Sequence, residues 1–378
     1  MRIFQVIEGS SNATVAGSQT WHRNLYEPLV EMGHDVLLFS VTEGRIAMQR
    51  DDTAGRARFS QKLLDTFHRE HARKPFALFF SYLMDGMVDP SVVDAIRQAG
   101  VPTCNFSCNN AHQFFLVDEL SPHFDFNLHA EKDARDKFIA IGASPLWWPM
   151  ASNPKYFKPQ DVPRTIQASF VGANYGLRAR GVAHLLENGI DAHAFGPGWV
   201  DGARTRWRSL AKRYLYIWQT LSTSDPERQN AASAKLSDHD FRRFLSARFP
   251  ANVHAPVTDD ELISLYSRSH ISLGFLEVYS SHNPSGPVTR HLHLREFEAP
   301  MCGALYCTGY MDELAEMFEP DKEVLVYRTQ DELLDKVRFY SAHPVQAELI
   351  RAAGRVRALA EHTYQERFRQ LFRTLGLV

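Results

Sequence analysis

The arrangement that most constrains this fold is a short apolar segment, a polar loop, an amphipathic segment ending in glycine, and a second apolar segment. It opens the chain: MRIFQVI (1–7) is typical of a strand, residues 20–33 have helical periodicity and end at Gly33, and HDVLLFSV (34–41) is typical of a second strand. A strand, a helix and a returning strand in this order form the βαβ unit of a parallel sheet. We therefore expect an α/β fold with parallel strands.

The same arrangement recurs in two series along the chain. The expected strands are 75–83, 101–108 and 124–130 in the first series, and 166–173, 190–196, 271–278, 304–308 and 323–328 in the second. Between the two series, residues 144–165 are rich in proline and lack periodicity, which is typical of a linker. We expect a first domain over 1–155 and a second over 156–361, with a helical insertion at about 200–250.

Helical segments dominate after residue 330, and the last of them, 362–378, is expected to cross back to the first domain. Two open parallel sheets that face each other form a cleft at the carboxyl ends of their strands, where ligands bind. Helix N-termini at such a cleft favour phosphate groups. The expected architecture is two Rossmann-like sheets facing across a cleft, with a helical C-terminal tail.

Composition limits the partners and the compartment. The 378-residue chain has a formal net charge of -2, so it has no basic field for nucleic acid. It has no apolar run near the ~20 residues needed to span a bilayer, and residues 1–7 lack the long apolar core of a signal peptide. Four cysteines match no zinc-binding spacing, namely Cys104, Cys108, Cys302 and Cys307. We expect a cytoplasmic protein with reduced thiols.

The segment HLHLREFEAPMCGALYCTGY (291–310) contains candidate ligand-binding residues. Proline is favoured in a first helical turn, so the segment 285–287 predicts a helix start. That helix would run to Cys302, with Gly303 as its left-handed end. Glu298 would then be held rigidly and could accept two hydrogen bonds from vicinal hydroxyls, as on a ribose, while Arg295 could bind a phosphate. The alternative is an Arg–Glu pair on a solvated helix face.

A second candidate is the loop in SFVGANYGLRAR (169–180). It follows a predicted strand and contains Gly172, Asn174 and Tyr175, and it leads to Arg178 and Arg180 at a predicted helix start. A loop in this place followed by arginines suits a diphosphate. The sequence lacks the GxGxxG pattern, so a plain turn with exposed arginines is the alternative.

These segments resemble the CgeB-like (spore maturation protein) glycosyltransferases of the glycosyl transferase group 1 set. The resemblance is strongest over 258–370, looser in the first half, and is carried by FVGANYGLR (170–178), AFGPGW (194–199), RxFEAPxCGA (295–304), 310–333, EHTYQERF (361–368), GHDV (33–36) and GVPTCNFSCNN (100–110).

The resemblance implies a GT-B fold that binds the nucleotide-sugar donor on the C-terminal domain and the acceptor on the N-terminal domain, without an obligatory metal. It implies that Glu298 holds the donor ribose and that Arg178, with Arg180, holds the diphosphate.

The chain departs from the family pattern at two places. Arg290 stands where many related enzymes have a second glutamate, eight residues before Glu298. Asn109 and Asn110 stand where an Asp pair is common, and asparagine cannot act as a general base. His112, two residues later, is the alternative candidate base.

Three further candidates complete the predicted site. His22 is the rival to His112 as the base, and Asn12 is expected to line the acceptor side. Arg290 is retained as a candidate substrate-binding residue, as are Asn109 and Asn110. Whether the reaction inverts or retains the anomeric centre is open.

The insertion contains a basic amphipathic helix at about 203–221. Trp207, Leu210, Tyr214, Ile217 and Leu221 recur at spacings of three and four, with arginines and lysines beside them. Such a helix can lie in a membrane interface, which would suit a lipid-linked acceptor. The alternatives are packing on its own domain and contact with a second copy of the chain.

We expect a metal-independent, cytoplasmic glycosyltransferase, with contact to the inner face of the membrane as an additional property of the insertion. The donor would be a UDP, GDP or dTDP sugar and the acceptor a carbohydrate, a lipid-linked sugar or a protein. Two alternatives remain open: a nucleotide-sugar 2-epimerase on the same fold, and a non-catalytic nucleotide-sugar-binding protein.

Overall fold

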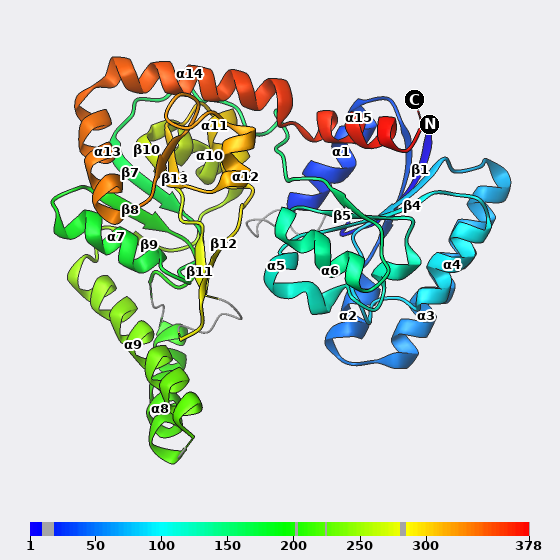
Figure 1. The fold of residues 1–378 in the computed structure, drawn as a ribbon, viewed down its shortest axis with the longest axis horizontal. Helices are drawn as coiled ribbons and strands as arrows, with labels where there is room; N and C mark the ends of the chain where they lie inside the picture. The colour runs from blue at the N-terminus through cyan, green and yellow to red at the C-terminus, as the bar shows by residue number, and fades with distance from the viewer. Residues whose placement is uncertain (10–18, 201–202, 224, 280–284, 378) are drawn as a thin grey trace. The chain divides into compact units, whose positions relative to one another are not determined.

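The computed structural model describes residues 1–9, 19–200, 203–223, 225–279 and 285–377 (Figure 1). The chain forms two compact units, one made of Met1–Asn153 with His362–Val378 and the other of Pro154–Glu361. Each unit is built around a six-stranded sheet. Within the described residues, no helix is both long and apolar enough to cross a membrane.

Unit 1 has an all-parallel sheet in the order β2-β1-β3-β4-β5-β6. Its strands are β1 (Arg2–Ile7), β2 (Asp35–Ser40), β3 (Leu78–Ser81), β4 (Thr103–Ser107), β5 (Phe126–His129) and β6 (Pro145–Trp147). Its helices are η1 (His22–Tyr26), α1 (Glu27–Glu31), α2 (Thr42–Gln49), α3 (Thr53–Arg73), α4 (Pro90–Gln98), α5 (Asn110–Gln113), η2 (Phe114–Leu116), η3 (Ser121–His123), η4 (Lys132–Ala134), α6 (Arg135–Ala140) and α15 (Tyr364–Thr374).

The C-terminal helix α15 is part of the core of unit 1. Phe368 is fully buried, and its ring centroid lies 5.4 Å from that of Phe80 and 5.3 Å from that of Trp148. The indole Nε1 of Trp148 donates a hydrogen bond of 3.0 Å to the carbonyl of Arg367, whose Nε donates to the carbonyl of Pro149. Residues more than 200 positions apart in the sequence thus close this core.

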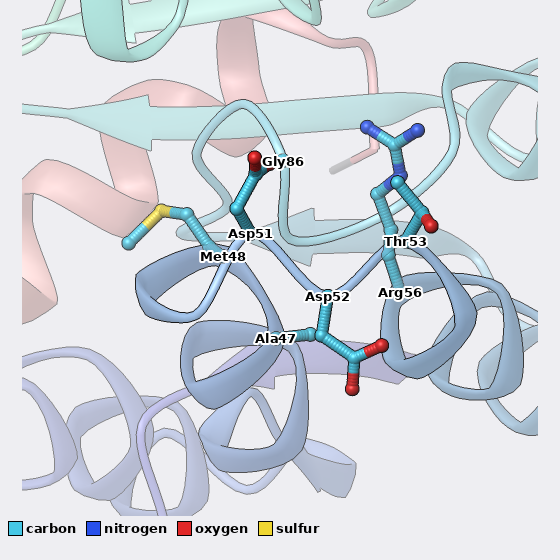
Figure 2. A pocket seen from close by; sticks show the side chains of 7 residues that line it. All are labelled: Ala47, Met48, Asp51, Asp52, Thr53, Arg56 and Gly86. Atoms are coloured by element: carbon cyan, nitrogen blue, oxygen red, sulfur yellow. The ribbon is translucent and has the colours of Figure 1, made fainter.

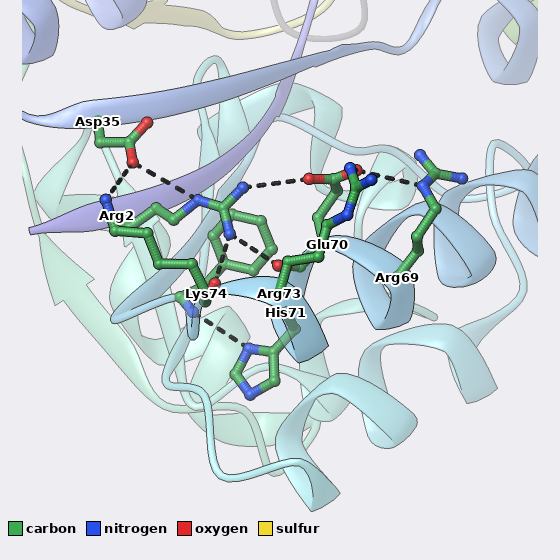
Figure 3. A network of polar contacts seen from close by, with 8 residues as sticks. Arg2, Asp35, Arg69, Glu70, His71, Arg73 and Lys74 are labelled. Carbon is green, nitrogen blue, oxygen red and sulfur yellow. Dashed lines mark hydrogen bonds and ion pairs between the residues drawn. The ribbon is translucent and has the colours of Figure 1, made fainter.

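A polar network ties the start of β1 to the end of α3 (Figure 3). Arg2 donates through Nη1 to the carbonyl of Glu70 at 2.7 Å and through Nη2 to its carboxylate at 3.2 Å. Asp35, at the start of β2, accepts from Lys74 at 2.7 Å. The Arg2 guanidinium also lies 4.4 Å from the centre of the Phe76 ring. These contacts hold the first two strands against the longest helix of the unit.

Unit 2 has a parallel sheet in the order β14-β13-β10-β7-β8-β9. Its strands are β7 (Ile166–Val171), β8 (Ala192–Phe195), β9 (Val253–His254), β10 (Ser269–Leu273), β13 (Tyr306–Gly309) and β14 (Leu325–Tyr327), and a separate antiparallel pair is formed by β11 (Glu277–Tyr279) and β12 (Val288–Arg290). Its helices are α7 (Arg178–Glu187), α8 (Ala203–Ser222), α9 (Pro226–Arg248), α10 (Asp259–Arg268), α11 (Arg295–Met301), α12 (Asp312–Met317), α13 (Gln330–Ala342) and α14 (Pro344–Glu361).

Two parallel six-stranded sheets with helices confirm the predicted α/β class and the helical C-terminal region. The helical insertion is a hairpin in which α8 and α9 run alongside each other (Figure 1). The capping box at α10 is also present: Thr258 accepts from the backbone N–H of Glu261, whose carboxylate accepts from the backbone N–H of Thr258.

Two predictions of local structure are wrong. The expected linker 144–165 contains β6, because Pro145–Trp147 pairs with β5 and extends the sheet of unit 1. The expected helix start at 285–287 is also absent, since Val288–Arg290 form β12 and the helix begins only at Arg295. The β-branched Val288 and Thr289 pair across to β11 there. Gly303 does follow that helix in the left-handed conformation, at φ 68°.

Candidate functional site

The loop that follows β7 lies where the chain reverses direction across the second sheet. The strands β8 and β9 extend the sheet on one side of β7, whereas β10, β13 and β14 extend it on the other. In open α/β sheets, ligands bind at such a reversal, outside the carboxyl ends of the strands. Three of the predicted donor-binding residues, Gly172, Asn174 and Tyr175, are in this loop.

The start of this loop is held close to the end of β8. The N–H of Gly172 donates to the carbonyl of Phe195 at 2.8 Å, and the carbonyl of Gly172 accepts from the indole Nε1 of Trp199 at 2.7 Å. A Cβ on Gly196 would lie 2.4 Å from that carbonyl oxygen. Gly196 also has φ 142°, a backbone conformation that residues with a side chain rarely adopt. Both the short contact and the backbone conformation therefore require glycine at this position.

Arg295, the first residue of α11, lies against the loop. A Cβ on Gly172 would be 2.5 Å from Nη2 of Arg295, and the guanidinium lies 5.0 Å from the centre of the Phe170 ring. Its Nη1 is buried and has no hydrogen-bond partner among the residues that the structure describes. A positive group with a spare donor therefore lies at the carboxyl end of β7, where an anion would be held by charge and hydrogen bonds together.

Arg178 is buried behind the same loop, with 1% of its surface exposed. Its Nη1 donates to the carbonyl of Ala173 at 3.0 Å, its Nη2 lies 2.9 Å from Nε2 of His293, and its guanidinium stacks on the Tyr175 ring at 3.8 Å. Burial, with Arg295 nearby, lowers the pKa of Arg178 to about 10, so it stays charged at neutral pH. Arg178 shapes the loop from inside and adds positive potential beneath it.

A buried acid organises the start of α11. Glu296 is fully buried and accepts from the Tyr306 hydroxyl at 2.6 Å and from the backbone N–H of His293 at 2.5 Å. Burial raises the pKa of Glu296, and the neighbouring Arg295 opposes that shift. Glu296, His293 and Tyr306 were not among the site residues predicted from the sequence, although the repeated His-Leu pair at 291–294, followed by Arg295 and Glu296, was a visible signal of a polar cluster.

Glu298 lies two residues after Glu296 on α11, and 8% of its surface is exposed. Burial raises the pKa of its carboxyl to about 8; Asp259 and Glu296 push it in the same direction, and Arg295 opposes them. Among the described residues, none donates a hydrogen bond to the carboxylate of Glu298. A buried acid whose oxygens keep their acceptor capacity can bind hydroxyl groups of a ligand.

The far end of the loop is tied to the helical insertion. The carbonyl of Asn174 accepts from Nη1 of Arg242 on α9 at 2.6 Å, and the side chain of Asn174 donates to the carbonyl of Gly198 at 3.2 Å. Arg180 is exposed, and its guanidinium lies 5.0 Å from the ring centre of Phe241, also on α9. Arg180 thus lies toward α9, whereas Arg178 and Arg295 lie against the Tyr175 and Phe170 rings.

Arg290 is part of an ion pair on the small antiparallel sheet. Its Nε donates to Oε1 of Glu277 at 3.1 Å, across from it on β11. The Glu277 carboxylate lies close to the end of β13, since a Cβ on Gly309 would be 3.1 Å from Oε1. A carboxylate on the neighbouring strand therefore pairs with Arg290, and this pairing between strands could not be predicted from the local sequence.

The predicted acceptor residues belong to unit 1. His22 is in η1 with Nδ1 3.5 Å from the Glu27 carboxylate, and His112 is in the short helix α5. Asn109 precedes α5 at φ 61°, a left-handed conformation that asparagine tolerates. Asn110 is buried and accepts from the Ser107 hydroxyl at 3.2 Å. Asn12 lies outside the described residues.

A small hollow in unit 1 offers no competing site. It lies at the turn between α2 and α3 and has a volume of about 40 Å³ (Figure 2). Its lining includes Asp51, Asp52, Arg56 and Gly86. Ligand pockets usually have volumes of ~300–1,000 Å³, so this hollow can hold a few water molecules but no nucleotide.

Comparison with protein families gives a match over just over half of the chain. The sequence model of a family described as "Glycosyl transferase-like" matches residues 178–373, which include α7, the hairpin and α11. No curated protein sequence matches the chain.

The described residues include no group of three or more His, Cys, Asp or Glu side chains placed to hold a metal ion.

Solved structures with a similar fold include glycosyltransferases and a sucrose-phosphate synthase. The sucrose-phosphate synthase from Thermosynechococcus elongatus aligns with a TM-score of 0.59 at 14% identity over 100% of both chains. Alr3699/HepE from Anabaena, in complex with UDP-glucose, aligns at 0.60 and 10% identity over 100% of both chains. A glycosyltransferase from Rickettsia africae aligns at 0.60 and 10% identity over 99% of this chain and 97% of that one. The fold is therefore of the GT-B class.

Proposed function

Because this chain belongs to the glycosyl transferase-like family, we propose that it moves a sugar from a nucleotide diphosphate sugar to an acceptor. The observation that carries the proposal is the Arg295 guanidinium against Gly172, with a buried Nη1 that lacks a hydrogen-bond partner among the described residues. The donor diphosphate would bind at this point, over the loop 172–177. Arg178 would add charge from beneath without direct contact.

In the transfer, the bond between the anomeric carbon and the diphosphate oxygen breaks and its electron pair goes to the diphosphate. Arg295 stabilises the negative charge that develops there. Glu298 accepts hydrogen bonds from the ribose hydroxyls and so fixes the nucleotide. An acceptor group replaces the diphosphate at the anomeric carbon and loses a proton, for which His112 of unit 1 is our candidate base and His22 the rival.

The donor site is tested by nucleotide binding to two arginine variants. Calorimetry with UDP, GDP and dTDP identifies the base, and UDP is the first probe because Alr3699/HepE holds UDP-glucose. We expect R295M to weaken binding of the preferred nucleotide at least tenfold, since a charge-assisted hydrogen bond is lost. The matched control R180M removes an exposed arginine that lies over the Phe241 ring and should retain most of the affinity. Equal affinities in the two variants would sink the assignment of the diphosphate to Arg295.

Turnover separates transfer from its alternatives. Incubation of the nucleotide sugar with a panel of carbohydrate, lipid-linked and protein acceptors should release the nucleoside diphosphate, with the same rate in EDTA if no metal takes part. An epimerised sugar nucleotide without acceptor would indicate a 2-epimerase. Tight binding with no product across the panel would indicate a non-catalytic binding protein.

The insertion also supports contact with a membrane surface. Tyr214, Trp218 and Leu221 are at i, i+4 and i+7 of α8 and are 67%, 64% and 79% exposed. Aromatic and aliphatic side chains on one face of a basic helix suit the headgroup region of a bilayer. We expect the protein to sediment with phosphatidylglycerol vesicles and W218S/L221S to lose this property. V345S/L349S removes equally exposed apolar side chains from α14 and should sediment as the wild type does, and equal loss in both variants would refute the proposal.

A further inference from the structure

A cavity of about 410 Å³ lies between the helical hairpin and the loop after β7. It is lined by Tyr175 and Gly176 of the loop, by Lys212 and Tyr216 of α8, by Lys235, Asp238, His239 and Arg242 of α9, and by Tyr279 of β11. Its volume is in the range of small-molecule sites, ~300–1,000 Å³. All of these residues belong to unit 2.

The charges around the cavity favour an anion. Arg242 and Asp238 pair at 2.5 Å and so offset each other. Lys212 and Lys235 make no ion pair or hydrogen bond with any residue that the structure describes, and both line the cavity. Two lysines without carboxylate partners leave an excess of two positive charges over a confined volume. Lysine ammonium groups bind phosphate as point charges.

The rings around the cavity favour a ligand with a ring of its own. Tyr175, Tyr216 and Tyr279 line it from three different elements. Tyrosine rings pack on the apolar faces of sugars and on planar bases while their hydroxyls form hydrogen bonds. Tyr216 is held edge-on to the His239 ring at 6.3 Å, which limits its freedom before any ligand arrives.

The cavity is connected directly to the loop that we assign to the donor. Arg242 lines the cavity and donates to the carbonyl of Asn174, in the middle of that loop. Gly176 also lines it, and a Cβ there would lie 2.8 Å from the carbonyl oxygen of Glu277, so the loop packs directly on β11. A ligand in the cavity would therefore contact the same loop as the donor diphosphate, from the side of the insertion.

We propose that this cavity binds a phosphate ester of a ring compound. The phosphate would lie between Lys212 and Lys235, and the ring among the three tyrosines. Two sources share this chemistry: a phosphorylated sugar that serves as acceptor, and the nucleotide donor itself if it extends past Gly176. The first source rests on the proposed transferase function; the cavity and its charge do not.

The test compares K212A/K235A with R295M, using glucose 6-phosphate and UDP as calorimetric probes. If the ligand is a phosphorylated acceptor, K212A/K235A loses at least tenfold affinity for glucose 6-phosphate and keeps its affinity for UDP. If the donor extends into the cavity, K212A/K235A loses affinity for UDP instead. The double variant R228A/K322A, which removes the same charge from exposed positions of unit 2, should bind both probes as the wild type does.

Unchanged affinities of K212A/K235A for both probes, with unchanged circular dichroism, would overturn the proposal. Equal losses of affinity in K212A/K235A and R228A/K322A would also overturn the proposal, because the loss would then follow from the change in net charge and not from the position of the lysines. The donor assignment fails separately, through unchanged UDP binding by R295M, and that result leaves the cavity test intact.

Discussion

At the scale of residues, the candidate donor site contains several ionisable side chains that are buried close to one another. Arg178 and Arg295 are opposed by Glu296 and Glu298, but only Glu296 has its carboxylate bonded by protein donors on both oxygens. Burying a carboxylate without such bonds disfavours its ionised form, which is the cause of the raised pKa of Glu298. A ligand with hydroxyl groups would supply the missing donors.

This arrangement predicts a pH dependence of stability. The pKa of Glu298 is about 8 in the folded protein, against 4.5 as the ordinary value, so between these values the folded state binds more protons than the unfolded state. The stabilisation is complete below pH 4.5 and is lost as the pH rises to 8, by ~1.4 kcal/mol per unit of pKa difference. Urea unfolding between pH 5 and 9 should show this decline in the wild type, and E298Q should largely abolish it. The exposed control E187Q should keep the wild-type slope; a wild-type slope in E298Q would contradict the assignment.

At the scale of elements, the loop after β7 depends on a close approach of two backbone segments. Gly196 follows β8, and because it has no Cβ, the backbone at this position can lie against the carbonyl of Gly172. Trp199 fixes the same carbonyl through its indole N–H. The shape of the loop is thus decided by the strand beside it as much as by its own sequence.

Replacing Gly196 by alanine should both destabilise unit 2 and weaken nucleotide binding. The new Cβ would meet the Gly172 carbonyl at 2.4 Å and force the loop away from Arg295. The control G189A has φ 79° and nothing within 4 Å of the added Cβ, so it incurs only the conformational cost of ~1 kcal/mol. Thermal unfolding and UDP calorimetry on both variants make the comparison, and equal affinities would show that the loop geometry does not matter for binding.

At the scale of the whole molecule, the chain forms two units, and helix α15 belongs to the same unit as strand β1. The aromatic core that α15 shares with β3 and with Trp148, just beyond β6, joins segments that lie before and after unit 2 in the sequence. Part of the core of unit 1 therefore comes from a helix that follows all of unit 2 in the sequence.

Truncation of Phe368 tests this dependence. F368A removes a fully buried ring and should destabilise unit 1 by ~3–5 kcal/mol. Hydrogen exchange measured by mass spectrometry should show faster exchange in β3 and β6, with β7 and β10 unchanged. F115A, which removes a ring that is 67% exposed in the same unit, should have little effect. Equal loss of protection in both units would show that they unfold together.

The sequence by itself determined the features that depend on neighbours along the chain. The α/β class, the helical insertion, the capping box of Thr258 and Glu261, and the glycine that ends α11 all follow from periodicity and from backbone preferences within a few residues. For the candidate site, the sequence indicated which residues take part, since Glu298, Arg295 and the loop after β7 lie in recognisable segments. It did not indicate the contacts that these residues make.

Only the tertiary structure decided what those residues touch. It placed Val288–Arg290 in a strand, buried Arg178 behind the loop, brought Glu277 opposite Arg290, and enclosed a cavity between the insertion and the loop. Each of these depends on contacts between segments far apart in the sequence. Burial and long-range pairing set the charge state and direction of a side chain, and neither is encoded in its immediate neighbours.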